Sequence, residues 1–147
     1  ALDVTIQDQI IKLINSIRSE LDMGVLLITH DLGVIAQMCD KVAVMYAGYF
    51  VEHADTYTLL SNPMHPYTKG LIDAIPNGKK GVLKSIPGNT PSLINLPEGC
   101  PFHPRCFMCQ EICTKKIPDM VKVGENHYSR CHFAEKMSQY AGVIDAD

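Results

Sequence analysis

Five of the six cysteines in this chain of 147 residues lie between Cys100 and Cys131. Four of the five follow the pattern C-x5-C-x6-C-x17-C, namely Cys100, Cys106, Cys113 and Cys131. Four thiolates are the donors that a structural zinc ion or an iron–sulfur cluster requires, because anionic sulfur neutralises the metal and fixes its geometry. This spacing is looser than that of paired C-x2-C knuckles. It therefore favours a larger cluster over a single tetrahedral ion.

A zinc site is the first alternative for this segment. Cys106 and Cys109 form one C-x2-C pair, and His103, His127 and His132 are available as nitrogen ligands. Buried thiols without a metal are the second alternative, but a proline-studded loop segment cannot easily bury so many cysteines without a cross-link. The chain begins without a signal-peptide pattern, which favours thiolate ligation in a reducing compartment over disulfides.

A histidine at the end of an apolar run is the second candidate for chemistry. The run Val25–Thr29 is rich in branched residues, and His30 and Asp31 follow it directly. It predicts a buried parallel strand that carries His30 to the edge where open α/β sheets bind their ligands. A capping or merely structural histidine would leave the same pattern, so both interpretations remain open at this point.

The elements that must position these residues follow from hydrophobic periodicity and turn residues. The first apolar set lies on one face of a helix that we expect to pack on a sheet: Ile6, Ile10, Leu13, Ile14, Ile17 and Leu21. A helix followed by a buried strand is the second half of a βαβ crossover. The sequence predicts helices over 4–22, 31–39, 55–60 and 67–75, and strands over 25–29, 41–47 and 49–53, the last two joined by a turn at Gly48.

Composition divides the chain and excludes some classes of function. Residues 76–98 form a proline-rich, glycine-bearing connection between a regular part, 1–75, and a cysteine-rich part, 99–147. The net charge is −3 and the basic residues are scattered, which argues against nucleic acid as a partner. No run approaches the roughly 18 apolar residues of a membrane span, so we expect a soluble chain.

Taken in order, these motifs resemble one family. Ala1-Leu2-Asp3, Leu26–Val34 (LLITHDLGV) and Asp40–Gly48 (DKVAVMYAG) are similar to the second half of an ATP-binding-cassette nucleotide-binding domain. The continuation resembles the C-terminal extension of the ATPase subunits of bacterial and archaeal oligopeptide or dipeptide importers. It consists of Asn62–Thr68 (NPMHPYT), Ile86–Gly88 (IPG), Gly99–Phe102 (GCPF) and Arg105-Cys106. The resemblance covers nearly the whole chain and fades after about Phe133.

This resemblance implies an α/β fold: the C-terminal part of an ABC-type P-loop nucleotide-binding domain, followed by a loop-rich, cysteine-containing extension. It implies that His30 is the switch histidine, which contacts the γ-phosphate and the attacking water of ATP across a closed dimer. Asp3 would belong to the D-loop at the interface with a second ATPase subunit. The positions of Cys100, Cys106, Cys113 and Cys131 are associated with a [4Fe-4S] cluster in this family, with zinc as the alternative. The family usually has another residue at Cys109, which is then a substitute ligand or a bystander.

The implied function is ATP hydrolysis that drives peptide import. In an intact parent protein, ATP and Mg²⁺ would be the cofactors, and the partners would be two permease subunits and, indirectly, a peptide-binding protein. The subunit would be peripheral on the cytoplasmic face of the plasma membrane. The two competing hypotheses are a zinc-stabilised binding module and a soluble ABC-type ATPase of the DNA-repair kind.

The motifs that hold nucleotide phosphates do not occur in these 147 residues. They contain neither a G-x-x-x-x-G-K-[ST] loop nor the acidic strand end and Ser-Gly-Gly signature that accompany it. We therefore expect a fragment without ATPase activity of its own. We also expect it to self-associate through the apolar surface of the first helix and strand.

Overall fold

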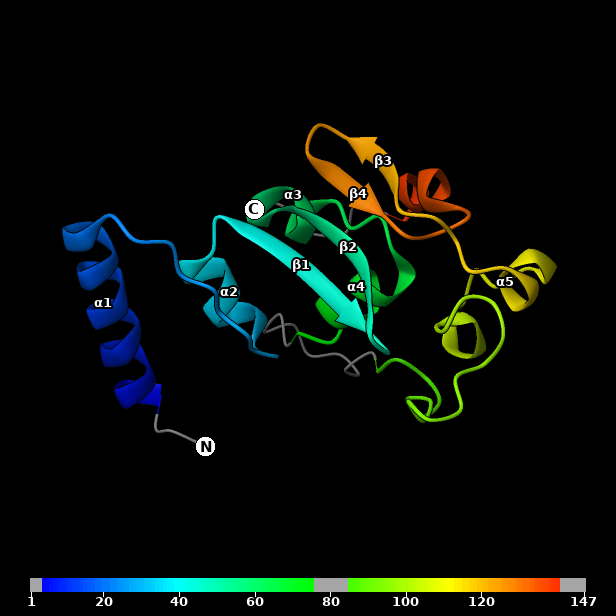
Figure 1. The fold of residues 1–147 in the computed structure, drawn as a ribbon, viewed down its shortest axis with the longest axis horizontal. Coiled ribbons are helices and arrows are strands. Elements are labelled where there is room, and N and C mark those ends of the chain that lie inside the picture. The colour runs from blue at the N-terminus through cyan, green and yellow to red at the C-terminus, as the bar shows by residue number, and fades with distance from the viewer. Residues whose placement is uncertain (1–3, 76–84, 141–147) are drawn as a thin grey trace, which may run out of the picture. The chain divides into compact units, whose positions relative to one another are not determined.

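The computed structural model describes residues 4–75 and 85–140, and the chain forms two compact units, Ala1–Asp40 and Lys41–Asp147. Figure 1 shows the elements in chain order from blue to red. The helices are α1 (Val4–Leu21), α2 (Leu32–Met38), α3 (Thr56–Ser61), α4 (Pro66–Asp73) and α5 (Glu111–Lys115), and the strands are β1 (Lys41–Tyr46), β2 (Tyr49–Asp55), β3 (Val121–Gly124) and β4 (His127–Ser129). Two 3₁₀-helices, η1 (His103–Arg105) and η2 (Ala134–Gln139), complete the set. Within the described residues, no helix combines the length and the apolar composition that crossing a membrane requires.

The first unit contains the two helices that the sequence predicts for it. α1 confirms the helix expected over 4–22, and α2 confirms the one expected after Asp31. The Asp31 carboxylate caps α2 by accepting the backbone N–H groups of Gly33 and Val34, at 2.8 and 3.2 Å. The Arg18 guanidinium donates to the Met38 carbonyl at 3.1 Å and so ties α1 to the end of α2.

The strand predicted over 25–29 is wrong for the described residues. This segment is extended but pairs with no strand, and the side chains of Leu26 and Ile28 are 89% and 90% exposed. A strand needs a neighbour that takes up its backbone N–H and carbonyl groups, and residues 4–40 contain no described partner for it. The expected packing of α1 on a sheet fails for the same reason, since Ile6, Ile10 and Leu13 are exposed.

The second unit is built on one antiparallel sheet with the strand order β1-β2-β4-β3. The β1–β2 hairpin confirms the two strands predicted around Gly48: Ala47 and Gly48 both have positive φ, 48° and 82°, as a tight hairpin turn requires. β2 then pairs with β4 in the register Glu52↔Ser129. A strand from the cysteine-rich segment therefore lies beside a strand from the 41–55 segment. The proposed division into 1–75, 76–98 and 99–147 stays a prediction.

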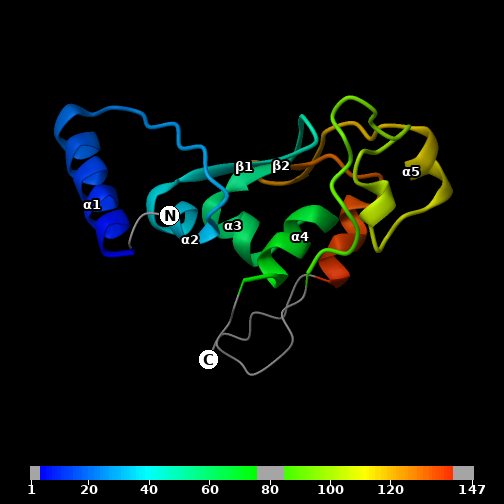
Figure 2. The same ribbon diagram turned by 90° about the horizontal axis from the view of Figure 1, so that it is seen from below.

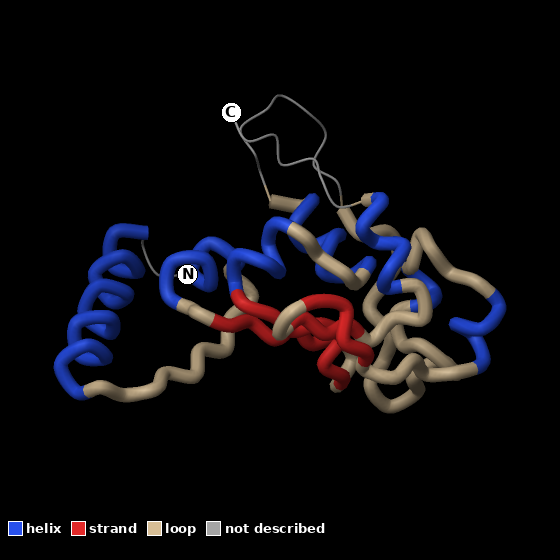
Figure 3. The backbone as a smooth tube through the Cα atoms, turned by 90° about the horizontal axis from the view of Figure 1, so that it is seen from above, coloured by secondary structure: helices blue, strands red, loops and turns tan. Residues whose placement is uncertain are grey.

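The core of this unit lies between the sheet and a layer of helices. Figures 2 and 3 show α3, α4 and η2 on one face of the sheet. β1 alternates exposed and buried residues along its length, as a strand with one covered face should. The most deeply buried apolar side chains among the described residues are Leu59, Met137, Phe102 and Ala134.

α3 and α4 occupy the places predicted for them, and side-chain caps fix their first turns. The Asp55 carboxylate accepts the Thr58 backbone N–H at 2.9 Å, which confirms the helix expected from Asp55. α4 begins at Pro66, one residue earlier than predicted, and its cap is the Nδ1 atom of His65, 3.1 Å from the Tyr67 nitrogen. Residues 76–84 of the predicted connection over 76–98 lie outside the described residues.

Candidate functional site

His30 lies between the extended segment and the cap of α2. Its side chain is exposed and lies within electrostatic range of the Asp31 carboxylate. Hydrogen bonds from the Val34 backbone, the Gln7 amide and the Gly33 backbone hold the pKa of Asp31 below its ordinary value. The residue after His30 is thus fixed by three contacts, while the imidazole itself faces solvent. Asp3, the other residue assigned to nucleotide chemistry, lies outside the described residues.

The cysteine-rich segment crosses itself between Cys100 and Cys113. The Cys100 backbone N–H donates to the Cys113 carbonyl at 2.8 Å. Gly99 has a φ of 71°, and a Cβ placed there would lie against the same carbonyl, far inside van der Waals contact. Only glycine fits this crossing, which puts Cys100 beside the start of α5.

All four predicted thiols gather at this crossing. Cys106 lies at the end of η1 and Cys131 follows β4, and the thiol of each is within electrostatic range of the other and of Cys100 and Cys113. The four residues come from separate turns of the chain, spread over more than thirty positions in the sequence. The four thiols thus lie within electrostatic range of one another, and their role as one ligand set stays a prediction.

Backbone N–H groups point at three of the four sulfur atoms. Cys100 accepts from the backbones of Phe102 and His103, Cys106 accepts from Met108, and the Phe133 N–H lies 3.4 Å from the Cys131 sulfur. Such hydrogen bonds stabilise a thiolate over a thiol. They are an arrangement suited to metal-ligating sulfur.

Burial opposes ionisation of the same thiols. Burial, with a smaller contribution from the neighbouring thiols, raises the pKa of Cys106 to about 12 and that of Cys131 to about 11. The pKa of Cys100 is raised for the same reason. In the absence of a cation these thiols are therefore protonated at neutral pH, and a bound metal would reverse that balance because it deprotonates its thiol ligands outright.

The described residues contain no group of three or more His, Cys, Asp or Glu side chains placed to hold one metal ion. The zinc alternative needs such a group, because its ligands converge on a single atom about 2.3 Å from each sulfur. In a four-iron cluster each thiolate binds a different iron, so the sulfurs lie farther apart. The choice between a cluster and a zinc ion at these thiols therefore stays a prediction.

The three histidines considered as zinc ligands are engaged elsewhere. His103 Nδ1 lies 3.0 Å from the Cys100 carbonyl, and His132 Nε2 lies 2.9 Å from the Lys116 carbonyl. His127 is buried, with Nε2 2.7 Å from a carboxylate oxygen of Glu52. Cys109 is exposed, and its thiol forms a hydrogen bond with that of Cys113.

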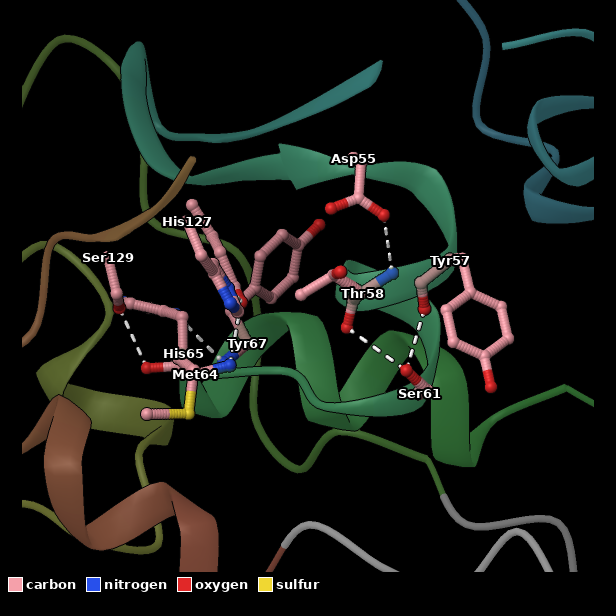
Figure 4. Close-up of polar contacts among 10 residues, drawn as sticks. Asp55, Tyr57, Thr58, Ser61, Met64, His65, Tyr67, His127 and Ser129 are labelled. Atoms are coloured by element: carbon pink, nitrogen blue, oxygen red, sulfur yellow. Dashed lines mark hydrogen bonds and ion pairs between the residues drawn. The ribbon is translucent and has the colours of Figure 1, made fainter. Parts of the chain in front are cut away.

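A buried polar network, which the sequence interpretation missed, joins the two halves of the second unit. Glu52 is fully buried on β2, pairs with His127 on β4, and accepts the Met64 backbone N–H at 2.6 Å. The Ser129 hydroxyl donates to the Met64 carbonyl at 2.7 Å (Figure 4). The available signal was a glutamate in the middle of the predicted apolar strand over 49–53. The network fixes the loop before α4 against both strands.

The Met64–Tyr67 motif has a structural explanation. Burial lowers the pKa of His65 to about 3, so its ring is neutral and caps α4 through Nδ1. The Tyr67 ring lies 4.6 Å from that of Tyr46 and 5.4 Å from that of Phe102. This aromatic cluster packs α4 against β1 and the segment that contains Cys100.

Arg105 anchors the chain next to Cys106. Its guanidinium donates to the carbonyls of Pro87 and Ile86 at 2.9 and 3.3 Å and to the Thr90 hydroxyl at 3.2 Å. It also lies over the Tyr46 ring, 6.0 Å from the centroid. Arg105 thus ties the chain next to Cys106 to the 86–90 segment and to Tyr46 on β1.

Comparison with known proteins finds a family model and relatives that match parts of this chain. Residues 51–113 match the family model described as the C-terminal region of oligopeptide/dipeptide transporters. The chain is 43% identical over 138 residues to a dipeptide transport ATP-binding protein of Caldanaerobacter subterraneus subsp. tengcongensis, covering 92% of this chain and 42% of that protein. It is 47% identical over 120 residues to an oligopeptide transport ATP-binding protein of Salmonella typhimurium (80% and 36%), and 50% identical over 115 residues to one of Haemophilus influenzae (77% and 36%).

The chain thus spans about two fifths of the length of these relatives. The matched family region begins on β2 and ends at Cys113, so it contains the Met64–Tyr67 motif and three of the four gathered cysteines. Residues 51–113 thus match the model of the C-terminal region of oligopeptide/dipeptide transporters, and most of the chain is similar to a part of dipeptide and oligopeptide transport ATP-binding proteins.

Proposed function

We propose that this chain is part of an ATP-hydrolysing subunit that powers peptide import through a membrane permease. The observation that carries the proposal is the 43% identity to a dipeptide transport ATP-binding protein over 92% of the chain. ATP and Mg²⁺ would bind in a protein of the relatives' full length. The partners would be a second ATPase subunit, permease subunits and, indirectly, a peptide-binding protein, with the subunit on the cytoplasmic face of the membrane.

His30 would act on the terminal phosphate of ATP in that full-length protein. A solvent-facing imidazole whose neighbour, Asp31, is fixed by three hydrogen bonds is suited to orienting an attacking water and stabilising charge on the phosphate. Asp3 would connect the two nucleotide sites at the dimer interface.

The role of His30 is tested by His30→Ala in a full-length subunit that contains these residues, assembled with its permease in proteoliposomes. We expect ATP turnover to fall by about a hundredfold or more, and transport to be lost, because one preorganised contact to the reacting phosphate disappears. The matched control is His53→Ala, which removes a histidine that is stacked on Tyr128, 4.6 Å away, and that has no assigned chemical role. Near-normal ATP turnover in His30→Ala would contradict the catalytic role.

We propose further that Cys100, Cys106, Cys113 and Cys131 hold a [4Fe-4S] cluster, with zinc as the alternative. The gathered thiols and the backbone N–H groups that point at three of them support this set. The cluster would supply cross-linking of a segment that is mostly loop. The chain's own contribution is to gather the sulfurs, donate hydrogen bonds to them and shield them from water.

This site is tested by anaerobic reconstitution of the chain with iron and sulfide. We expect about four iron atoms per chain and a brown, oxygen-sensitive product. Cys106→Ser should lose most of the iron, whereas Cys39→Ser, which lies in the first unit, should retain it. A colourless protein that binds one zinc ion per chain would overturn the cluster in favour of zinc.

A further inference from the structure

Cys109 has no part in the proposed four-thiol site, yet it lies next to one of its members. Its thiol forms a hydrogen bond with that of Cys113 and is within electrostatic range of Cys100. Cys109 is exposed whereas Cys113 is buried, and both are free cysteines. An exposed thiol thus lies beside a buried one at the edge of the thiol cluster.

Two consecutive turns bring these residues together. The Cys109 backbone N–H donates to the Cys106 carbonyl at 3.2 Å, and the Cys113 N–H donates to the Gln110 carbonyl at 2.9 Å. Gln110 is the extended residue before α5, so the chain turns sharply between the two cysteines. Residues four positions apart at such a turn have the short separation that a disulfide needs.

Cys113 is held in place more firmly than Cys109. The backbone at Cys113 is held by the hydrogen bond from Cys100 and by the close packing of Gly99 against its carbonyl. The Cys109 side chain faces solvent, with only a 3.8 Å contact from its sulfur to the Gln110 carbonyl besides Cys113. Of the two side chains, that of Cys109 is therefore the one with the freedom to rotate toward the other.

We propose that Cys109 and Cys113 form a disulfide when the chain meets a low-molecular-weight disulfide such as oxidised glutathione. The bond itself depends only on the two thiols. Its consequence rests on the proposed cysteine site: with Cys113 in a disulfide only three of the four thiols remain, and the cluster cannot assemble. The exposed fifth cysteine would make metal loading of this segment dependent on the redox state.

The reaction is a thiol–disulfide exchange in two steps. The Cys109 thiol loses its proton and attacks one sulfur of the small disulfide, which forms a mixed disulfide and releases one small thiol. The Cys113 thiol then loses its proton and attacks the Cys109 sulfur, which releases the second small thiol. Two protein thiols are oxidised, one small disulfide is reduced to two thiols, and these take up the two protons.

Peptide mapping of the metal-free chain tests the bond. The chain is treated with oxidised glutathione, its remaining thiols are blocked with iodoacetamide, and it is digested with trypsin and a glutamate-specific protease. Cleavage after Arg105, Glu111 and Lys115 places Cys109 on peptide 106–111 and Cys113 on peptide 112–115. We expect these peptides to be joined in the parent chain and in Cys106→Ser, and the joined species to be lost in Cys109→Ser. Joined peptides at an unchanged level in Cys109→Ser, or a Cys113 that is still alkylated after oxidation of the parent chain, would overturn the proposal.

Measurements of iron uptake test the disulfide proposal and the cluster proposal separately. Oxidised parent chain should take up little iron, and oxidised Cys109→Ser should take up as much as the reduced protein. If the reduced chain binds no iron while the joined peptides form, the cluster proposal fails and the disulfide stands. If the reduced chain binds iron and the oxidised chain binds it equally well, the redox dependence fails and the cluster stands.

Discussion

Gly99 is the residue on which the geometry of the cysteine cluster depends most directly. Its φ of 71° is in the left-handed region, and its missing side chain leaves room for the Cys113 carbonyl. The adjacent hydrogen bond from Cys100 to that carbonyl then sets the distance between two turns of the chain. Two separate physical requirements, backbone conformation and space, thus meet at one position.

Gly99→Ala should destabilise the second unit and open the thiol cluster. The left-handed conformation costs about 1–2 kcal/mol for a residue with a Cβ, and overpacking against the Cys113 backbone adds about 1–3 kcal/mol. Gly48→Ala is the matched control, because Gly48 also has a positive φ, 82°, but nothing lies within 4 Å of its added Cβ. Urea unfolding should show the larger loss for Gly99→Ala, and only this variant should increase the alkylation rate of Cys100 and Cys113. Equal losses for the two variants would show that packing at Gly99 contributes nothing.

At the scale of elements, local signals predicted more than non-local ones. The caps at Asp31 and Asp55 and the turn at Gly48 each act within a few residues, and the helices and the hairpin lie where these residues predict them. The segment 25–29 fails as a strand because a strand's identity depends on a neighbour rather than on its own sequence. β3 and β4 are short, and β4 joins the sheet by pairing with β2 on one side and with β3 on the other.

The candidate site shows the same difference between local signals, which the sequence displays, and non-local contacts, which it does not. The grouping of Cys100, Cys106, Cys113 and Cys131 into one set is a prediction from residue type and spacing, which the sequence displays. The partner of His127 does not, because Glu52 is 75 residues away in the chain and is buried with it by the β2–β4 pairing. One oxygen of the buried Glu52 carboxylate contacts both His127 and the Met64 N–H. Burying this carboxylate is unfavourable in free energy unless both contacts form. The network therefore favours the observed pairing of the cysteine-rich segment with β2.

At the scale of the whole molecule, the two compact units differ in how well they cover their apolar side chains. The second unit places a helical layer over its sheet and buries Leu59, Phe102 and Met137 almost completely. The first unit leaves Ile6, Leu13, Leu26 and Ile28 exposed. Apolar surface in contact with water is unfavourable in free energy. Association that buries this surface would therefore stabilise the first unit.

We therefore expect the 147-residue chain to self-associate through the first unit. The extended segment at 25–29 has backbone groups that pair with no strand of the described residues, so a second copy can add to it edge to edge. Ile28→Asp should weaken the association at least tenfold, because it places a charge at the expected contact. The matched control is Ile94→Asp, which changes an equally exposed isoleucine, also 90% accessible, in the second unit. Sedimentation equilibrium over a range of concentrations distinguishes the outcomes: a concentration-dependent mass that Ile28→Asp alone reduces is expected, and a clean monomer of the parent chain at high concentration would contradict the prediction.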